Sequence, residues 1–481
     1  MAGVGISFGN SSTFVALNRD GRSEIIANSA GERSTCTTVS FQEGEILTGT
    51  PALQMAVRQP QNSVNSLKSM MGCTLDAYPG PKQDCRMDPH ADEIIINFSN
   101  STRKGVSTLV KSVFENLKET VDSSLGEGKH DTVITVPVAA TPAFQKCITK
   151  SATAAGFTVT DLIPEPVAAL LHHSTNGDSH GTGHDVVLRI GGATMSVTLV
   201  KKVKGVFSIV DHTEERAGGN LFDQSVGKFF CGEFNRKNRC KMEENARSLC
   251  KVLKMAKSMK HHLSTLNTTE SNIECLFNDT DFVSKLSRPR FETIIQDDLS
   301  KISNVVKTFM SKYADLAIDR VILSGGSCRV VKLQTTVTSL FTNSRVISDF
   351  PDEVQALGAA THSDILKKFP ALASKVDPKA DGTVSVPALS AALEVRVGDE
   401  VVQVVPQHTP LPHSTEINLP EGPVFCLQVG NKVIAKAELS EDKGQVSLHL
   451  EIGEDCSIEG ILKDLASNER TSFSVPAPTG A

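Results

Sequence analysis

VGISFGNSSTFVAL, residues 4–17, places two β-rich runs on either side of the turn Gly9–Ser12. β-branched and aromatic residues favour strands, and Gly-Asn-Ser-Ser favours a tight turn, so this stretch predicts a hairpin with a polar tip. VVLRIGGATMSVTLV, residues 186–200, repeats the arrangement around the turn Gly191–Thr194. The recurrence of one strand–turn–strand plan far along the chain predicts two lobes of common design.

Helical periodicity fills the chain between and after these hairpins. Apolar residues recur three and four positions apart over 106–121, which predicts an amphipathic helix. The β-branched run 132–136 predicts a buried strand, and a helix is expected from Pro142, a residue that suits the first helical position. A strand at 320–323 and a helix at 330–340 continue the alternation. Strands alternating with helices predict an α/β fold.

The sequence changes character after Ser374. Prolines separate short β-rich runs such as 393–397 and 446–452, and no helical period is visible. This pattern predicts a small all-β sandwich domain. We therefore expect an α/β domain over residues 1–370, a linker over 371–385, a β domain over 386–475 and a tail over 476–481.

Composition excludes several classes of protein. The 481 residues include 39% hydrophobic and 22% charged residues, which is globular composition. Forty-nine basic and fifty-five acidic residues give a net charge of −6, so direct binding of nucleic acid is not expected. The eleven cysteines contain no CxxC pair, which indicates reduced thiols and no metal site. Without an apolar leader or an 18-residue apolar run, we expect a cytoplasmic protein with no membrane contact.

Three glycine-bearing turns indicate a nucleotide cleft. They lie at residues 9–12, 191–194 and 325–327, each at the end of a predicted strand. Glycine allows backbone N–H groups to approach a ligand, and neighbouring hydroxyls add hydrogen-bond donors suited to polyphosphate oxygens. Any one of these turns alone reads equally well as a hairpin or a helix cap. None fits the GxxxxGK[ST] or GxGxxG pattern, so the folds that carry those patterns are excluded.

Several segments follow one another in a characteristic order along the chain. They are Val4–Thr13, Ile25–Asn28 with Gly31–Arg33, Asn62–Val64 with Lys68 and Gly72, Val133–Pro137, Ile163–Ala169, Ser324–Ser327 with Arg329, and Pro351–Glu353 with Gly358–Ala360. Together with the turns, these segments resemble the nucleotide-binding domain of the 70-kDa heat-shock (DnaK-type) chaperones. The resemblance covers residues 1 to about 370, and the β unit is similar to the first half of that family's substrate-binding domain.

The resemblance implies a two-lobed, actin-like ATPase fold with ATP between the lobes. Lys68 and Glu165 occupy the positions of the family's catalytic lysine and water-positioning glutamate. The residues that the resemblance places around the nucleotide are Gly9, Asn10, Ser11, Gly191, Gly192, Thr194, Gly218, Gly219, Lys260, Ser264, Gly325, Gly326, Ser327, Arg329 and Asp352.

Departures from the family pattern concentrate where the nucleotide's phosphates would lie. The family carries aspartates where Ser7, Arg189 and Ser196 stand here, and a threonine where Asn10 stands. Phosphoryl transfer depends on Mg²⁺ and a positioned water, so losing three carboxylates predicts ATP binding with little or no hydrolysis, and the need for magnesium stays open. Arg189 either neutralises phosphate charge or turns away to pair with a surface acid.

Within the family, the chain resembles the atypical subunit of the ribosome-associated complex, which pairs with a zuotin-type J-domain protein. This implies a platform that reaches the ribosome through its partner and helps a separate, active heat-shock chaperone on nascent chains. The proline and missing leucine cluster around 382–389, and the absence of a helical lid after the β unit, agree with weak coupling between domains.

Three other functions remain to be weighed against this platform. The main alternative is an active ATP-dependent peptide-binding chaperone. An exchange factor would need long acidic insertions, and an actin-fold sugar kinase would need a carboxylate general base beside a sugar cleft. The sequence shows neither feature.

Overall fold

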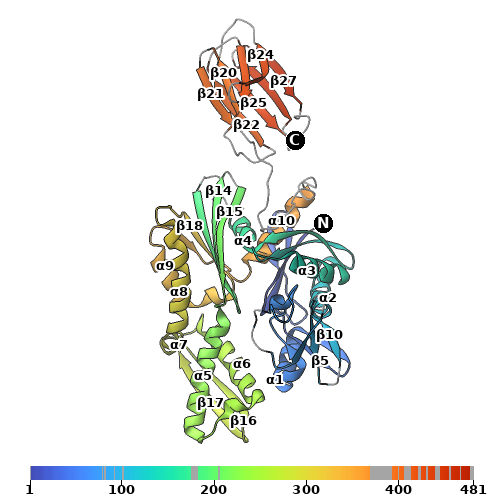
Figure 1. Ribbon diagram of the computed structural model, residues 1–481, viewed down its shortest axis with the longest axis vertical. Coiled ribbons are helices and arrows are strands. Elements are labelled where there is room, and N and C mark those ends of the chain that lie inside the picture. The colour runs from blue at the N-terminus through green and yellow to red at the C-terminus, as the bar shows by residue number, and fades with distance from the viewer. Residues whose placement is uncertain are drawn as a thin grey trace. The chain divides into compact units, whose positions relative to one another are not determined.

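The computed structural model describes residues 2–78, 80, 83–90, 93–99, 102–174, 183–203, 206–368 and most of 393–476. The chain divides into two compact units. One contains the described residues up to 368, and the other contains those from 393 onward (Figure 1). The expected linker 371–385 and residues 477–481 of the expected tail lie outside the described residues.

The first lobe of unit 1 is built on a twisted sheet whose centre is β1. Strand β1 runs antiparallel to β2, which follows it through the turn Gly9–Ser11, and parallel to β11. In sheet order the strands are β12 (Phe157–Pro164), β11 (His130–Val136), β1 (Gly3–Phe8), β2 (Ser12–Arg19) and β3 (Arg22–Ile25), and β4 (Thr35–Cys36) also pairs with β2.

The alternation of residues in β1 decides what covers each face of this sheet. Val4, Ile6 and Phe8 point into a core shared with α2 (Val106–Leu125) and α3 (Pro142–Ala154). The opposite face carries glycines, and α10 (Val354–Lys368) packs directly on it. A Cβ added at Gly5 would lie 2.1 Å from the backbone nitrogen of Ala360. Because glycine has no Cβ, α10 can pack directly against β1 at this position, although α10 comes late in the sequence.

Two small sheets and neighbouring helices also belong to the first lobe. A three-stranded sheet, β6 (Glu45–Thr48), β5 (Val39–Gln42) and β7 (Ser63–Val64), lies next to α1 (Gly49–Arg58). A second small sheet contains β10 (Arg103–Gly105), β9 (Ile94–Asn97) and β8 (Arg86–Pro89). The single-turn 3-10 helix η2 (Leu67–Met70) follows β7 and carries Lys68.

The second lobe repeats the plan of the first. Strand β13 forms an antiparallel hairpin with β14 and lies parallel to β18, as β1 does with β2 and β11. The sheet order is β15 (Val206–Glu215), β14 (Met195–Val203), β13 (Gly183–Ile190), β18 (Arg320–Ser324) and β19 (Arg345–Ile347). One face packs on α4 (Glu165–His173), which also contacts α10. The predicted two lobes of common design are confirmed.

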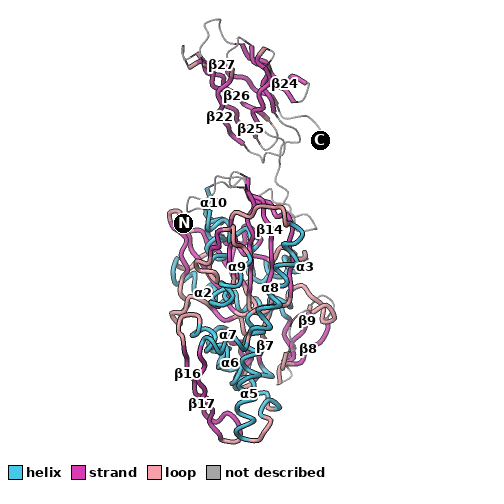
Figure 2. Tube along the Cα trace, turned by 90° about the vertical axis from the view of Figure 1, so that its left-hand side faces the viewer, coloured by secondary structure: helices cyan, strands magenta, loops and turns pink. Residues whose placement is uncertain are grey.

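Helices and a hairpin complete the second lobe. The other sheet face shares a large core with α8 (Gln296–Met310) and α9 (Val331–Leu340). Helices α5 (Gly219–Asn238) and α6 (Ala246–Leu263) lie beside the β16–β17 hairpin, as Figures 1 and 2 show. The remaining bounds are β16 (Thr268–Phe277), β17 (Thr280–Ser287) and α7 (Arg288–Ile294).

Unit 2 is formed by two four-stranded antiparallel sheets around one apolar core. The first contains β21 (Glu400–Val405), β20 (Leu393–Val397), β23 (Val424–Val429) and β24 (Lys432–Glu438). The second contains β22 (His413–Leu419), β25 (Val446–Ile452), β26 (Ile458–Asp464) and β27 (Arg470–Val475). The predicted fold class, a two-lobed α/β domain followed by a small all-β sandwich, is confirmed. Among the described residues, no helix is long and apolar enough to span a membrane.

Candidate functional site

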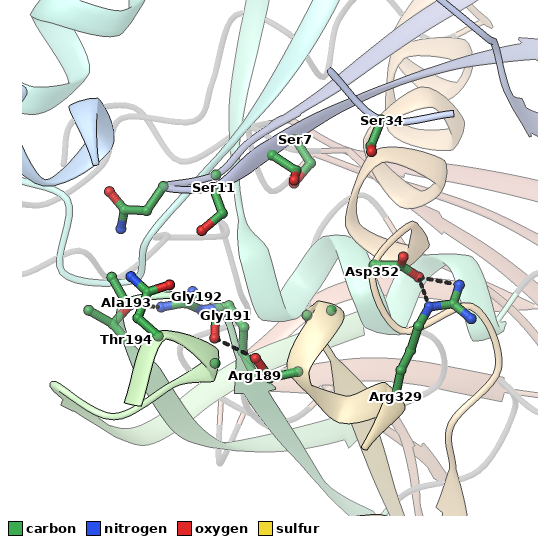
Figure 3. Close-up of a pocket in the computed structure, with 18 of the residues that line it drawn as sticks. Ser7, Ser11, Ser34, Arg189, Gly191, Gly192, Ala193, Thr194, Arg329 and Asp352 are labelled. Carbon is green, nitrogen blue, oxygen red and sulfur yellow. Dashed lines mark hydrogen bonds and ion pairs between the residues drawn. The ribbon is translucent and has the colours of Figure 1, made fainter. Parts of the chain in front are cut away.

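A cavity of about 380 Å³ lies between the two lobes of unit 1, within the size range of small-molecule sites. It collects every residue predicted to surround a nucleotide, and both predicted catalytic residues, with the exception of Gly218. The other lining residues are Ser7, Ser12, Phe14, Ser34, Arg189, Ala193, Asn220, Asp223, Lys257, His261, Val330 and Gln355. Figure 3 shows the turns of the two lobes on opposite sides of this pocket.

The two hairpin turns approach each other closely. Gly9 N–H donates to Ser12 O at 3.1 Å, and Gly191 N–H donates to Thr194 O at 2.9 Å, which closes each turn. A Cβ added at Gly192 would lie 2.2 Å from Ser11 Oγ. Backbone amides and hydroxyls are therefore brought together from both lobes, a donor set that fits phosphate oxygens.

Gly218 lies behind the pocket and does not line it. Its place is set by backbone packing, since a Cβ there would lie 2.6 Å from Gly191 O. Gly219 N–H donates to Gly191 O at 2.9 Å and Asn220 N–H donates to Gly192 O at 2.8 Å. These bonds attach the start of α5 to the second turn. Gly218 thus supports the turn, and the pocket contact comes from Gly219.

The side chain of Asn10 accepts hydrogen bonds from the short helix η2. Its Oδ1 accepts hydrogen bonds from the backbone N–H and the hydroxyl of Ser69, each at 3.0 Å. Because Ser69 belongs to η2, this contact fixes the short helix that carries Lys68. Asn10 therefore connects the first turn to the predicted catalytic lysine.

Lys68, Glu165 and Arg189 form a continuous chain of charges across the pocket. Lys68 Nζ contacts Glu165 Oε1, and Arg189 Nε lies 2.8 Å from Glu165 Oε2. Their side chains are only 8%, 4% and 12% exposed. Burial would raise the pKa of the Glu165 carboxyl, but the charges of Arg189 and Lys68 outweigh it and hold this pKa below its ordinary value. Both carboxylate oxygens are thus held by cations.

Arg189 stays in the pocket wall and reaches acids of two kinds. Besides buried Glu165, its Nη2 lies 3.1 Å from the partly exposed Glu214 and donates to Thr194 Oγ1 at 2.8 Å. Its Nη1 has no hydrogen-bond partner among the described residues. Of the two orientations considered for Arg189, pairing with a partly exposed acid is observed, and the guanidinium also stays in the pocket wall beside Glu165.

Two further ion pairs fix the positions of charged side chains elsewhere in the pocket wall. Lys260 lies 2.7 Å from Asp223 and donates to Gly219 O at 3.0 Å. Burial lowers the pKa of Lys260, although Asp223 opposes this effect. Arg329 and Asp352 face each other at 2.6 Å (Figure 3), and this hydrogen bond raises the pKa of Arg329.

The pocket wall has an excess of positive charge. Three carboxylates line it, those of Glu165, Asp223 and Asp352, and each is paired with a lining cation. Lys257 is a further lining cation, with no acid partner among the described residues. This wall fits a polyanion such as a nucleotide triphosphate. It offers a divalent cation no unpaired carboxylate among the described lining residues, so magnesium does not fit as a group held by this protein's own acids.

Sequence reasoning missed Asp223, Lys257, His261 and Gln355. Asp223 and Lys257 lie on α5 and α6, whose packing against each other brings them to the pocket, and no local motif marks either residue. His261 was within reach, since it directly follows the predicted Lys260. Gln355 lies on the first turn of α10, two residues after the end of the predicted Pro351–Glu353 segment.

Comparison with known proteins identifies the family. The family model described as Hsp70 protein matches residues 3–416. The chain is 31% identical to heat shock 70 kDa protein 14 of Danio rerio over 88% of this chain and 86% of that protein. It is 30% identical to heat shock 70 kDa protein 14-A of Xenopus laevis, over 97% and 92% of the two chains. The human protein named heat shock 70 kDa protein 14 is 30% identical over 76% and 74%. The chain belongs to the Hsp70 family of chaperones.

Proposed function

We propose that this protein binds ATP between its lobes and hydrolyses it little or not at all, as an atypical Hsp70-type subunit. The observation that carries the proposal is the double ion pairing of Glu165 by Lys68 and Arg189. A glutamate that orients and activates an attacking water must be free to turn toward the water and basic enough to accept its proton. Here two cations fix the Glu165 carboxylate and hold its pKa below the ordinary value, so it is a poor base for that water.

The pocket residues then serve to bind the triphosphate. The turns at Gly9–Ser11 and Gly191–Thr194 supply backbone N–H groups, while Lys68 and Nη1 of Arg189 supply positive charge. Bound magnesium would supply further charge neutralisation. With Ser7, Arg189 and Ser196 in place of acids, that charge comes from the protein instead. Losing a single preorganised electrostatic contact costs about 10²- to 10³-fold in rate, so turnover should be very low.

A non-hydrolysing member of this family is suited to act as a platform. We infer that it works in the cytoplasm with a zuotin-type J-domain protein in a ribosome-associated complex, and that the partner supplies ribosome attachment. The sequence departures at the phosphate turns and the net charge of −6 support this role over direct binding of ribosomal RNA. A separate, active Hsp70 would then fold the nascent chains.

Two measurements on the purified chain test the nucleotide part. We expect bound ATP to remain uncleaved over a single-turnover incubation, with no multiple-turnover release of phosphate. Phosphate release through many cycles, abolished by Lys68→Ala, would contradict the proposal and favour the active chaperone. As a positive control, the triple variant Ser7→Asp, Arg189→Asp, Ser196→Asp restores the family's acids and should hydrolyse faster than the parent chain.

The platform role is tested separately by affinity capture from a cytosolic extract. A stoichiometric J-domain protein together with ribosomes supports it, and loss of the ribosomes when that J-domain protein is depleted places the contact in the partner. Recovery of client peptides that ATP releases, without a J-domain protein, would instead identify an active peptide-binding chaperone.

A further inference from the structure

A buried chain of hydrogen bonds joins the two lobes beneath the phosphate turns. Ser7 Oγ donates to Gln355 Oε1 at 3.1 Å, and Gln355 Nε2 donates to Ser324 Oγ at 2.8 Å. The three residues are 7%, 7% and 0% exposed. None of them belongs to the Lys68–Glu165–Arg189 chain.

We call the hydrogen-bonded chain Ser7–Gln355–Ser324 the relay. Each of its residues lies in or next to a segment that lines the pocket. Ser7 lies on β1, two residues before Gly9 of the first phosphate turn, and Ser324 ends β18, directly before Gly325. Gln355 lies on the first turn of α10, which packs on β1 of the first lobe, while its neighbour Val354 packs in the core of the second-lobe sheet. The relay as a whole therefore crosses from β1 to β18, and the bond from Gln355 to Ser324 is its crossing bond to β18.

Separating the lobes would break that crossing bond. The amide of Gln355 and the hydroxyl of Ser324 are buried, and a buried polar group left without a partner costs about 1–3 kcal/mol. A backbone bond from Gly325 N–H to Pro351 O, at 2.5 Å, attaches the turn after β18 to the segment that leads into α10. The floor of the cleft is thus held by contacts that need no ligand.

We propose that Gln355 is a positioning residue that fixes the spacing of the β1 and β18 turns and keeps the cleft closed, so that bound nucleotide leaves slowly. The effect on nucleotide release rests on the proposed nucleotide binding, whereas the closure of the empty cleft does not. The first bond of the relay needs the hydroxyl of Ser7, which donates to Gln355 Oε1.

The experiment uses the full chain and three substitutions. Gln355→Leu removes both bonds while keeping a side chain of similar size, and Ser324→Ala removes only the crossing bond. Gln428→Leu is the matched control, because Gln428 is 3% exposed, donates to Glu394 Oε2 at 3.1 Å within unit 2 and does not line the pocket. Dissociation of a fluorescent ATP analogue and amide hydrogen exchange without nucleotide are measured for each.

We expect Gln355→Leu and Ser324→Ala each to speed dissociation of the analogue about tenfold. The double variant should be no faster than the faster single variant, because Gln355→Leu already removes the bond that Ser324→Ala removes. Exchange at residues 9–12 and 325–327 should rise in the same variants without nucleotide and stay unchanged in Gln428→Leu.

Unchanged exchange in Gln355→Leu, or independent additive effects, would overturn the inference. If the parent chain binds no nucleotide at all, the proposed function fails, and hydrogen exchange alone then decides the role of Gln355. Ser324→Ala keeps the test decisive should Gln355→Leu fold poorly, because it removes a single hydroxyl.

Discussion

Arg189 Nε lies 2.8 Å from Glu165 Oε2, which places a fixed cation beside the carboxylate that would orient an attacking water. The guanidinium is also held by Thr194 and Glu214, so its position does not depend on a ligand. The protein itself therefore supplies a positive charge at this point of the pocket.

Magnesium should matter little to ATP affinity. We expect the parent chain to lose less than about threefold in affinity when EDTA replaces Mg²⁺, because Arg189 supplies charge to the phosphates. Arg189→Asp should lose about tenfold or more in EDTA, as a charge-assisted hydrogen bond contributes roughly 1.5–3 kcal/mol, and should recover on adding Mg²⁺. Isothermal titration calorimetry measures both. Arg19→Gln, an exposed cation outside the pocket, is the control. A large loss in EDTA for the parent chain would refute this prediction.

Removing the charge of Glu165 should make stability depend on ATP. Glu165→Gln leaves Lys68 and Arg189 facing each other without their shared anion, and breaking a buried pair costs about 3–5 kcal/mol. Phosphate groups can then take the place of the carboxylate. Thermal unfolding should show a lower midpoint without nucleotide and a larger rise on adding ATP than in the parent chain.

The control for that comparison is Asp298→Asn. Asp298 is a buried carboxylate that pairs with Ser225 and Lys301 away from the pocket, so its loss should destabilise without changing the response to ATP. An equal rise with ATP in the parent chain and in Glu165→Gln would show that the phosphates do not reach these two cations.

Local patterns in the sequence predicted the α/β class and the two lobes of unit 1, and the resemblance to a known family predicted its actin-like fold. Val4, Ile6 and Phe8 alternate with Gly3 and Gly5, and this alternation already separates a core face from a face that another backbone can approach. The glycine-bearing turns can likewise be recognised from their residue types. Both features act over a few neighbouring residues, which is why a sequence can reveal them.

Contacts made across long sequence separations were not predictable. Nothing near Arg189 indicates that Glu165 would be its partner, and Gln355 gives no sign that it joins Ser7 to Ser324. Such pairings depend on how α4 and α10 pack between the lobes. The sequence therefore identified most of the pocket's residues but not the bonds among them.

Three strands of unit 2, β22, β26 and β27, were not predicted. Strand β26 has a regular alternation of buried and exposed residues, but its buried positions include Gly460 and Asp464 as well as Ile458 and Leu462. Strand β27 has no fully buried residue and lies at a sheet edge. Tertiary pairing, rather than an apolar pattern, makes these segments strands.

The buried ion pair between Asp185 and Arg320 should be essential to the second lobe. Asp185 Oδ2 lies 2.5 Å from Arg320 Nη2, with side chains 0% and 6% exposed, and the pair joins β13 to β18. We expect Asp185→Asn to lower the free energy of unfolding by about 3 kcal/mol, because it removes the buried carboxylate charge that faces the Arg320 guanidinium. Urea unfolding should be followed by circular dichroism, since the chain has no tryptophan.

An exposed pair gives the matched contrast. Arg19 and Glu24 are 3.5 Å apart with side chains 50% and 60% exposed, so Glu24→Gln should cost no more than about 0.5 kcal/mol. Similar losses of unfolding free energy in Asp185→Asn and Glu24→Gln would mean that burial does not determine how much each ion pair stabilises the protein.

His173 should make the protein less stable in mild acid. Burial lowers the pKa of its imidazole to about 4, helped by the nearby charges of His172, Arg320 and Arg345. An unfolded histidine has a pKa of about 6.5, so below that pH the unfolded chain takes up a proton that the folded chain refuses. Stability from this group is therefore complete above pH 6.5, falls as the pH drops, and is lost near pH 4.

The variant His173→Phe isolates this contribution, because phenylalanine keeps an aromatic ring against His172 but cannot be protonated. Between pH 7 and pH 5 the parent chain should lose about 1 kcal/mol more than the variant, which is less than the roughly 2 kcal/mol of a fully buried histidine because the ring is partly exposed. Urea midpoints at the two pH values measure the difference. Equal losses in both proteins would place the proton uptake at other groups and remove His173 as its source.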